Sequence, residues 1–184
     1  MKELLGLGLK RGTWDEARAW IGRDIARVVG ADQVNRADVR RKLEVFQFAS
    51  PLNTDDAFAQ QFGYEAAPAL TTMLSTWGLP PYWSPGEPAA RACEPHFIPY
   101  AILQIPAPGN NIFATNFSTE YFEPVYPGDW ISSVTRLISV TEKKTRVGEG
   151  AFMTVETTYI NQNGAVCGVE RVTAFRYAAE EVRT

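Results

Sequence analysis

Apolar residues recur at helical spacing through the first half of the chain. Thr13 and Asn35 occupy positions suited to helix N-caps, and Gly30 and Gly63 follow two of the expected helix ends. The last segment of this kind is nearly uncharged and mixes small with larger apolar residues, a pattern that predicts burial against a sheet. We therefore expect helices over 14–29, 36–48, 54 or 55 to 62, and 68–77.

The second half alternates apolar with polar positions, which indicates strands. Pro-Gly-Asp at 127–129, the glycines at 148 and 150, and Asn-Gly at 163–164 separate the alternating runs. These boundaries predict strands over 111–122, 130–142, 151–161 and 165–177, with a further strand near 32–35 completing five. One slim buried helix followed by long antiparallel strands predicts an α+β domain in which a sheet wraps a central helix.

Residues 79–110 contain 8 of the 12 prolines and show no period, so we expect an irregular loop or lid with one helical turn near 99–104. Five aromatic residues lie in or beside this stretch: Trp77, Tyr82, Trp83, Phe97 and Tyr100. Core packing is their simplest explanation. The alternative is a wide apolar pocket or a partner surface, since aromatic linings are usual in small-molecule sites.

Length and charge restrict the classes of protein. The 184 residues suit a single domain over 1–184, with 1–30 as an N-terminal helical extension. The net charge of −3 and the absence of a long basic block argue against nucleic-acid binding. No apolar run approaches the ~20 residues that cross a bilayer, and no secretory signal pattern is present, so we expect a cytoplasmic protein with no membrane partner.

Candidate metal ligands are few. His96 is the only histidine, and the two cysteines, Cys93 and Cys167, are far apart in the sequence. Neither a zinc site nor a disulfide framework is expected, and the cysteines are typical of a reducing compartment. No cofactor is expected either.

Several motifs, in order, resemble the MaoC-like acyl-CoA dehydratase and (R)-specific enoyl-CoA hydratase family, whose fold is the hot-dog. They are Pro-Leu-Asn-Thr-Asp at 51–55 before Ala-Phe-Ala at 57–59, Ala-Pro at 67–68, Tyr-Phe-Glu-Pro-Val-Tyr-Pro-Gly-Asp at 121–129, Lys-Thr-Arg-Val-Gly at 144–148 and Asn-Gln-Asn-Gly at 161–164. The resemblance covers about 31–178 and is closest to the amino-terminal or partner halves of double hot-dog enzymes.

The resemblance fails at the catalytic motif. Active members are similar to one another in a Gly-Asp-x-Asn-Pro-aliphatic-His motif, followed six residues later by Ala or Ser. Aligning Pro51, Leu52 and Ala59 with that motif places Phe48 on the Asp position and Asn53 on the His position, while Gln47 and Ser50 fall on the Gly and Asn positions. Hydration of an enoyl thioester needs groups that exchange protons near neutral pH. A phenyl ring and a carboxamide cannot do so.

We therefore expect a non-catalytic subunit of a heteromeric enoyl-CoA hydratase or dehydratase. The resemblance implies a partner hot-dog chain that carries the catalytic Asp and His, and an acyl-CoA substrate at the interface, with room for a bulky acyl group such as a steroid side-chain thioester. Three cations near the end of a hairpin could contact the CoA phosphates: Lys143, Lys144 and Arg146. This chain would supply the acyl-binding wall: Ala67, Pro68, Leu70, Met73, Leu74, Trp77, Tyr82 and Trp83.

Two other functions stay open. One is a hot-dog thioesterase that uses Asp55, Asp56 or Glu65 as its base. The other is a non-enzymatic acyl-CoA-binding or scaffold subunit. For Asp55 and Asp56, a position near a helix start is also explained by the helix dipole.

Overall fold

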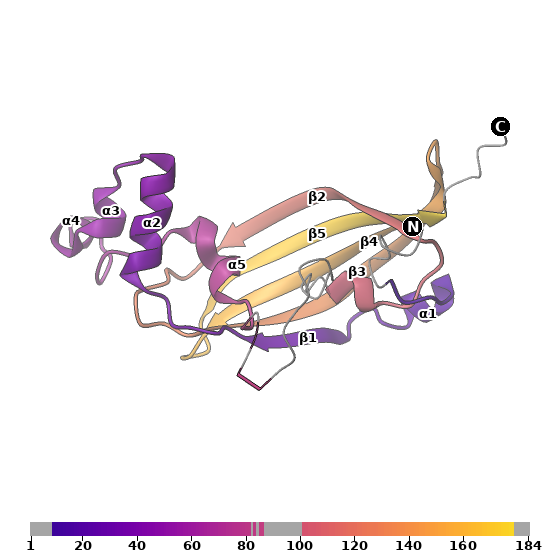
Figure 1. Cartoon of the computed structure of the whole chain (residues 1–184), viewed down its shortest axis with the longest axis horizontal. Coiled ribbons are helices and arrows are strands. Elements are labelled where there is room, and N and C mark those ends of the chain that lie inside the picture. Colours follow the sequence, from indigo (N-terminus) through magenta and orange to yellow (C-terminus); the bar gives the residue numbers. More distant parts are fainter. Residues whose placement is uncertain (1–8, 82, 84, 87–100, 179–184) are drawn as a thin grey trace.

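A single antiparallel sheet forms the body of the protein (Figure 1). The computed structural model describes residues 9–81, 83, 85–86 and 101–178. The sheet has five strands in the order β1-β3-β4-β5-β2. The strands are β1 (Asp24–Val29), β2 (Asn111–Tyr121), β3 (Ile131–Thr145), β4 (Gly148–Asn161) and β5 (Val166–Ala178).

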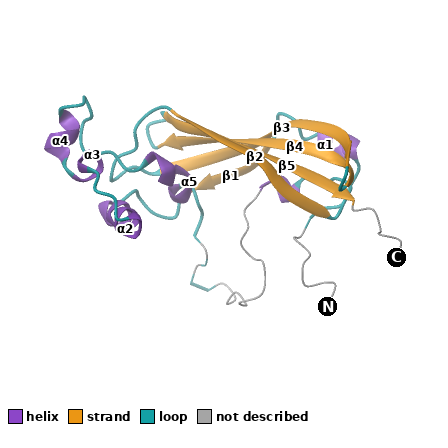
Figure 2. Ribbon diagram, turned by 90° about the horizontal axis from the view of Figure 1, so that it is seen from above, coloured by secondary structure: helices purple, strands orange, loops and turns teal. Residues whose placement is uncertain are grey.

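Short helices lie at the two ends of this sheet. Figures 1 and 2 show α2, α3 and α4 beyond one end and α1 at the other, while α5 approaches the sheet itself. The helices are α1 (Trp14–Arg18), α2 (Arg36–Phe46), α3 (Pro51–Thr54), α4 (Asp56–Gln60) and α5 (Leu74–Trp77), with 3-10 turns η1 (Thr71–Met73) and η2 (Ala101–Gln104). Among the described segments, no helix is long and apolar enough to cross a bilayer.

The predicted α+β hot-dog architecture is confirmed, and the four long strands follow the alternating pattern closely. The helix over 14–29 was wrong: α1 ends at Arg18, and Asp24–Val29 is strand β1. The predicted strand near 32–35 was also wrong, because β1 already occupies the edge of the sheet beside β3. Non-local pairing of Val28 with Ser133 therefore overrides the helical spacing.

The central helix is shorter than the predicted 68–77. The Ala69 N–H donates to the Val125 carbonyl at 2.7 Å, which holds the chain before it in an extended path. Leu70 keeps an extended conformation with ψ 121°, and the helical turns begin only at Thr71. Seven residues of η1 and α5 thus replace the expected ten-residue helix.

Two apolar clusters pack on the same face of the sheet, which we call the inner face. The first joins α2 and α5 to Ile131, Tyr159 and Cys167. The second joins α1 and η2 to Leu137, Met153, Val155 and Ala174. Gly30 permits the first cluster to close, since a Cβ there would lie 1.8 Å from the Trp77 carbonyl oxygen.

Arg176 fastens the second cluster. Its side chain is fully buried on the inner face, and its guanidinium donates to the carbonyls of Lys10, Ile105, Ala107 and Pro108, with 3.0 Å to Ile105 and 2.7 Å to Ala107. Burial lowers the pKa of Arg176 to about 10, helped by the nearby charge of Arg11. One arginine of the last strand therefore binds the segments before α1 and after η2.

Replacing Arg176 with Met should lower the free energy of unfolding by about 2–4 kcal/mol, because several buried carbonyls lose their donor. Urea denaturation at neutral pH measures the change. The exposed Arg146 is the matched control, and Arg146→Met should stay within about 0.5 kcal/mol of the parent. Equal stability of the two variants would contradict the proposed role of Arg176.

Candidate functional site

A cavity of about 210 Å³ lies between η1–α5 and the inner face of strands β2, β4 and β5. Its lining mixes three aromatic rings, two of them phenols, with four aliphatic hydroxyls and one carboxyl. The residues are Thr71, Thr72, Leu74, Ser75, Phe117, Thr119, Tyr121, Tyr159 and Glu170. The volume is below the ~300–1,000 Å³ of typical ligand pockets, so this space suits part of a ligand rather than a whole one.

A row of polar residues crosses the sheet at the floor of this cavity. Thr119 of β2 pairs with Glu170 of β5, which pairs with Thr157 of β4. Thr157 in turn pairs with Thr135 of β3, and their hydroxyl oxygens are 2.9 Å apart. Polar side chains are unusual in the middle of an otherwise apolar sheet face. The row separates the two apolar clusters.

Glu170 is the ionisable group of the row. Burial raises the pKa of its carboxyl, and no hydrogen bond or ion pair joins it to another side chain within the described residues. The adjacent Arg171 points to the opposite face, where it binds Glu156 and Glu120, each at 2.7 Å. Within the described part of the chain, no cation therefore pairs with Glu170 on the inner face.

Tyr159 forms the wall next to Glu170. It is 6% exposed, and burial, together with the negative charge of Glu170, raises the pKa of its phenol. The phenol is neutral at physiological pH and can donate a hydrogen bond. The cavity thus offers hydrogen-bonding groups on its floor and wall and aromatic surface at its β2 side.

Most of the predicted acyl-binding wall belongs to the core. Ala67, Pro68, Met73, Leu74 and Trp77 are buried, whereas Trp83 is 47% exposed. Of these residues and Leu70, Leu74 alone lines the larger cavity, and Leu70, Leu74 and Trp77 line a smaller space beside Val125 and Cys167. Tyr82 and His96 lie outside the described residues.

The two degenerate catalytic positions differ in their surroundings. Asn53 is half-buried on α3, and its Nδ2 donates to the Pro68 carbonyl at 2.8 Å, directly before the central helix. Its Oδ1 accepts from the Ser50 hydroxyl. Phe48 follows α2 and is 62% exposed. Asn53 therefore acts as a structural link here, and the alignment of these residues with the catalytic pair stays a prediction.

The proposed thioesterase bases have structural partners or lie on the surface. Asp55 caps α4 by accepting from the N–H groups of Ala57 and Phe58. Asp56 accepts from Arg36 and from the Ala67 N–H, and these hydrogen bonds lower the pKa of its carboxyl. Glu65 is exposed. None of the three lines the cavity.

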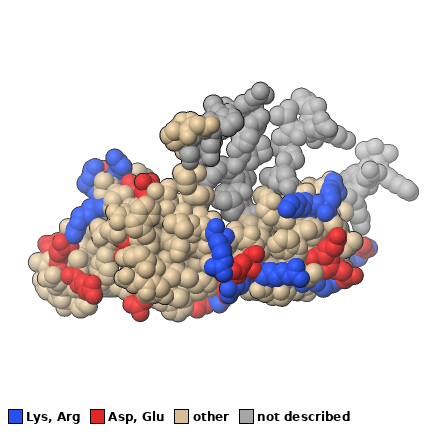
Figure 3. Space-filling view, turned by 90° about the horizontal axis from the view of Figure 1, so that it is seen from below, with Lys and Arg blue, Asp and Glu red and all other residues tan. Residues whose placement is uncertain are grey.

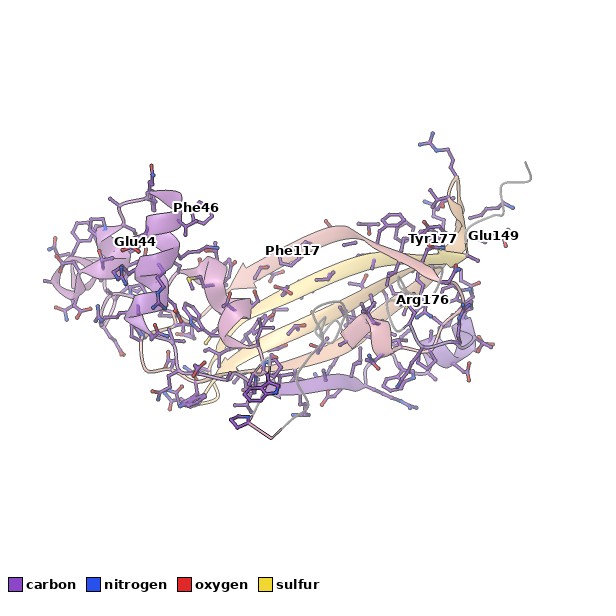
Figure 4. The ribbon with its side chains drawn as sticks, viewed as in Figure 1. Glu44, Phe46, Phe117, Glu149, Arg176 and Tyr177 are labelled. Atoms are coloured by element: carbon purple, nitrogen blue, oxygen red, sulfur yellow. The ribbon has the colours of Figure 1, made fainter. Side chains whose placement is uncertain are left out.

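The predicted phosphate-binding cations lie far from the cavity. Lys143 and Lys144 lie near the end of β3, and Arg146 follows that strand. Tyr159, which lines the cavity, is eleven residues along β4 from Gly148. At the rise per residue of a strand, Gly148 and Tyr159 are about 35 Å apart. Lys144 binds Glu149 at 2.9 Å. Figure 4 places Glu149 and Phe117 well apart along the sheet, and Figure 3 shows basic side chains intermixed with acidic ones. Contact of these cations with CoA stays a prediction.

The sequence-based analysis did not single out Glu170, Thr119 or Tyr159. A usable signal existed for Glu170. It occupies the same alternate positions of the last strand as Val172 and Ala174, so an acidic residue interrupts an apolar face. Only the register with β2 and β4 shows which polar neighbours accompany it.

Comparisons with known proteins agree with this fold. A family model described as "FAS1-like, dehydratase domain region" matches residues 19–168. The chain is similar to the "Probable enoyl-CoA hydratase alpha subunit" of Thermomonospora curvata, with 30% identity over 166 residues. That match covers 87% of this chain and 50% of the relative, so the chain spans about half the length of its curated relative.

Two solved complexes from Mycobacterium tuberculosis have similar chains. A chain of the ChsH1-ChsH2 complex matches with a TM-score of 0.69 and 17% identity, covering 92% of this chain and 93% of its own. A chain of the C-terminally truncated HadBC (3R-hydroxyacyl-ACP dehydratase) complex matches with a TM-score of 0.55 and 15% identity, covering 83% and 96%. These likenesses concern the fold.

The fold defines a MaoC-like hot-dog protein. Within that class, the chain belongs to the FAS1-like dehydratase domain family. The model of that family matches most of the length of this chain.

Replacing Glu170 with Gln should stabilise the protein most at high pH. A carboxyl whose folded pKa is raised favours folding when protonated, and this contribution is lost as pH rises through the folded pKa. The Tm advantage of Glu170→Gln should therefore be small near pH 4 and grow toward pH 8. Thermal unfolding across this range, with the exposed Glu149→Gln as control, measures it. A Tm advantage that shrinks with rising pH would refute the argument.

Proposed function

We propose that this chain is a subunit of a heteromeric enoyl-CoA hydratase or dehydratase, with the acid and base supplied by a partner MaoC-like chain. The observation that carries the proposal is a small cavity beside an edge strand, β2, that the described residues leave unpaired on one side. Phe117, Thr119 and Tyr121 of the edge strand β2 line the cavity, and Phe117 is 63% exposed. A second chain against β2 would complete the site.

The two edge strands of the sheet, β1 and β2, differ in length and in charge. Edge strand β1 has six residues, carries Asp24 and Arg27, and is interrupted by a register shift after Asp24. Edge strand β2 has eleven residues and a single charged one, Glu120. Charges and irregularities normally protect an edge from pairing. A register shift also interrupts β2, between Ala114 and Asn116, but β2 has one charged residue in eleven and β1 has two in six. This contrast favours β2 as the partner's strand.

The division of chemistry follows from the residues that the alignment puts at the two catalytic positions. Adding water to an enoyl thioester requires a base to take a proton from water and an acid to protonate the α-carbon. Neither Phe48 nor Asn53 can exchange protons near neutral pH. In our proposal the partner performs both transfers, and this chain holds the acyl group along α5 and the inner face of the sheet.

The relatives support the same assignment without extending it to a substrate. The curated relative is described as an enoyl-CoA hydratase alpha subunit, and two structural neighbours come from complexes of two named chains. We propose an acyl-CoA as the ligand. Its acyl group would be bulky, of a lipid or steroid type. We also propose a cytoplasmic location, which rests on the composition of the sequence.

Co-expression tests the function. The chain should be purified with a MaoC-like protein that retains the complete Asp and His motif and is encoded by a neighbouring gene. The complex should hydrate a 2-enoyl-CoA, followed by loss of enoyl thioester absorbance, at least about 10²-fold faster than this chain alone. Equal activity of this chain alone would overturn the proposal. Ligand binding without turnover in the complex would indicate a scaffold subunit instead.

Two lysines on β2 should prevent assembly. Asn116 and Ser118 are exposed, and Asn116→Lys with Ser118→Lys adds charge to the edge that the partner needs. We expect at least a tenfold loss of affinity for the partner, measured by titration with size-exclusion analysis. Val29→Lys, at an exposed position of β1, is the matched control and should assemble normally. Normal assembly of the double variant would rule out the β2 interface.

A further inference from the structure

The position of Glu170 demands an explanation beyond folding. On the inner face of β5 it lies two residues from Val172, which packs against the second apolar cluster. Leu74 of α5 lines the same cavity, and the buried ring of Tyr159 lies beside Glu170 on the neighbouring strand β4. An apolar side chain would fit such surroundings at lower cost, because a half-buried carboxyl without a cation destabilises a fold. A carboxyl retained there is suited to binding.

The neighbours of Glu170 are also suited to binding. Thr119 flanks it on the adjacent strand β2, and Ser75 of α5 lies on the same cavity. Hydroxyls both donate and accept, whereas a carboxyl donates only when protonated. Together they can form hydrogen bonds with a ligand oxygen that donates and with one that only accepts. Phe117 and Tyr121 offer apolar surface next to this polar row.

We propose that Glu170 and the adjoining hydroxyls bind a hydroxyl or keto oxygen carried on the acyl group, away from the thioester. The assignment rests on the function proposed above, and it adds the substrate class: acyl thioesters with an oxygenated, rather than a purely hydrocarbon, distal part. A hydroxyl ligand donates to the Glu170 carboxyl. A keto ligand accepts from the protonated carboxyl or from a threonine hydroxyl.

The surrounding chemistry agrees with both ligand types. Burial raises the pKa of Glu170, so its protonated form persists to higher pH than for an exposed glutamate. Arg171 is engaged on the opposite face and cannot compensate the charge. The cavity holds only part of a ligand, as expected if the thioester end lies toward the partner at the β2 edge.

Binding of three probes tests the assignment. They are dodecanoyl-CoA, its terminal-hydroxyl derivative and its methyl-ketone derivative. Calorimetry on the chain with its partner, and on the chain alone, should show at least one oxygenated probe bound about three- to tenfold more tightly than the unsubstituted one. Which probe is preferred identifies the ligand oxygen.

Variants of Glu170 connect the preference to the residue. Glu170→Leu should abolish the preference, and Glu170→Gln should retain part of it because the amide still donates and accepts. The exposed Glu149→Leu is the control and should keep the full preference. Equal binding of all three probes by the parent, or an unchanged preference in Glu170→Leu, would overturn the assignment.

The two proposals can fail separately. Hydration by the complex without any preference among the probes would leave the heteromeric function standing and remove the role of Glu170. A preference that depends on Glu170, in a chain that no partner turns into a hydratase, would support the binding site and remove the proposed function.

Discussion

The structure depends on how one face of a five-stranded sheet is covered. In this chain no long helix lies along the described inner face. Seven residues of η1 and α5 cover one end, and α1 with η2 covers the other. Apolar packing at each end accounts for burial there, and Arg176 secures the second end through carbonyl hydrogen bonds. The middle of the face is left to a polar row and a cavity.

That arrangement joins folding to function. A polar row is tolerated in the middle of a sheet because Thr135 and Thr157 satisfy each other, but Glu170 has no such partner among the described side chains. The cavity reaches the edge strand β2, which is longer than β1 and carries one charged residue in eleven against two in six. A small cavity at an edge strand that the described residues leave unpaired on one side is the physical basis for expecting a second chain.

The residues at the two catalytic motif positions differ from the residues that line the cavity. The alignment identifies Phe48 and Asn53 as residues without useful proton chemistry, a conclusion that follows from residue type alone. The structure adds that Asn53 bridges Ser50 and Pro68, where it positions the chain entering the central helix. It also shows that Asp55 and Asp56 are occupied by capping and by Arg36. The carboxyl with access to the cavity is instead Glu170.

The sequence by itself determined the α+β class, the long strands from 111 onward and the turns between them, because alternation and turn residues are local properties. The loss of the acid/base pair stays a prediction. Tertiary structure decided the rest. Asp24–Val29 became a strand because β3 offered a partner, and the central helix started late because Ala69 bonds to Val125. Glu170, Thr119 and Tyr159 met only through strand register. Pairing between distant segments sets that register, and no local pattern contains it.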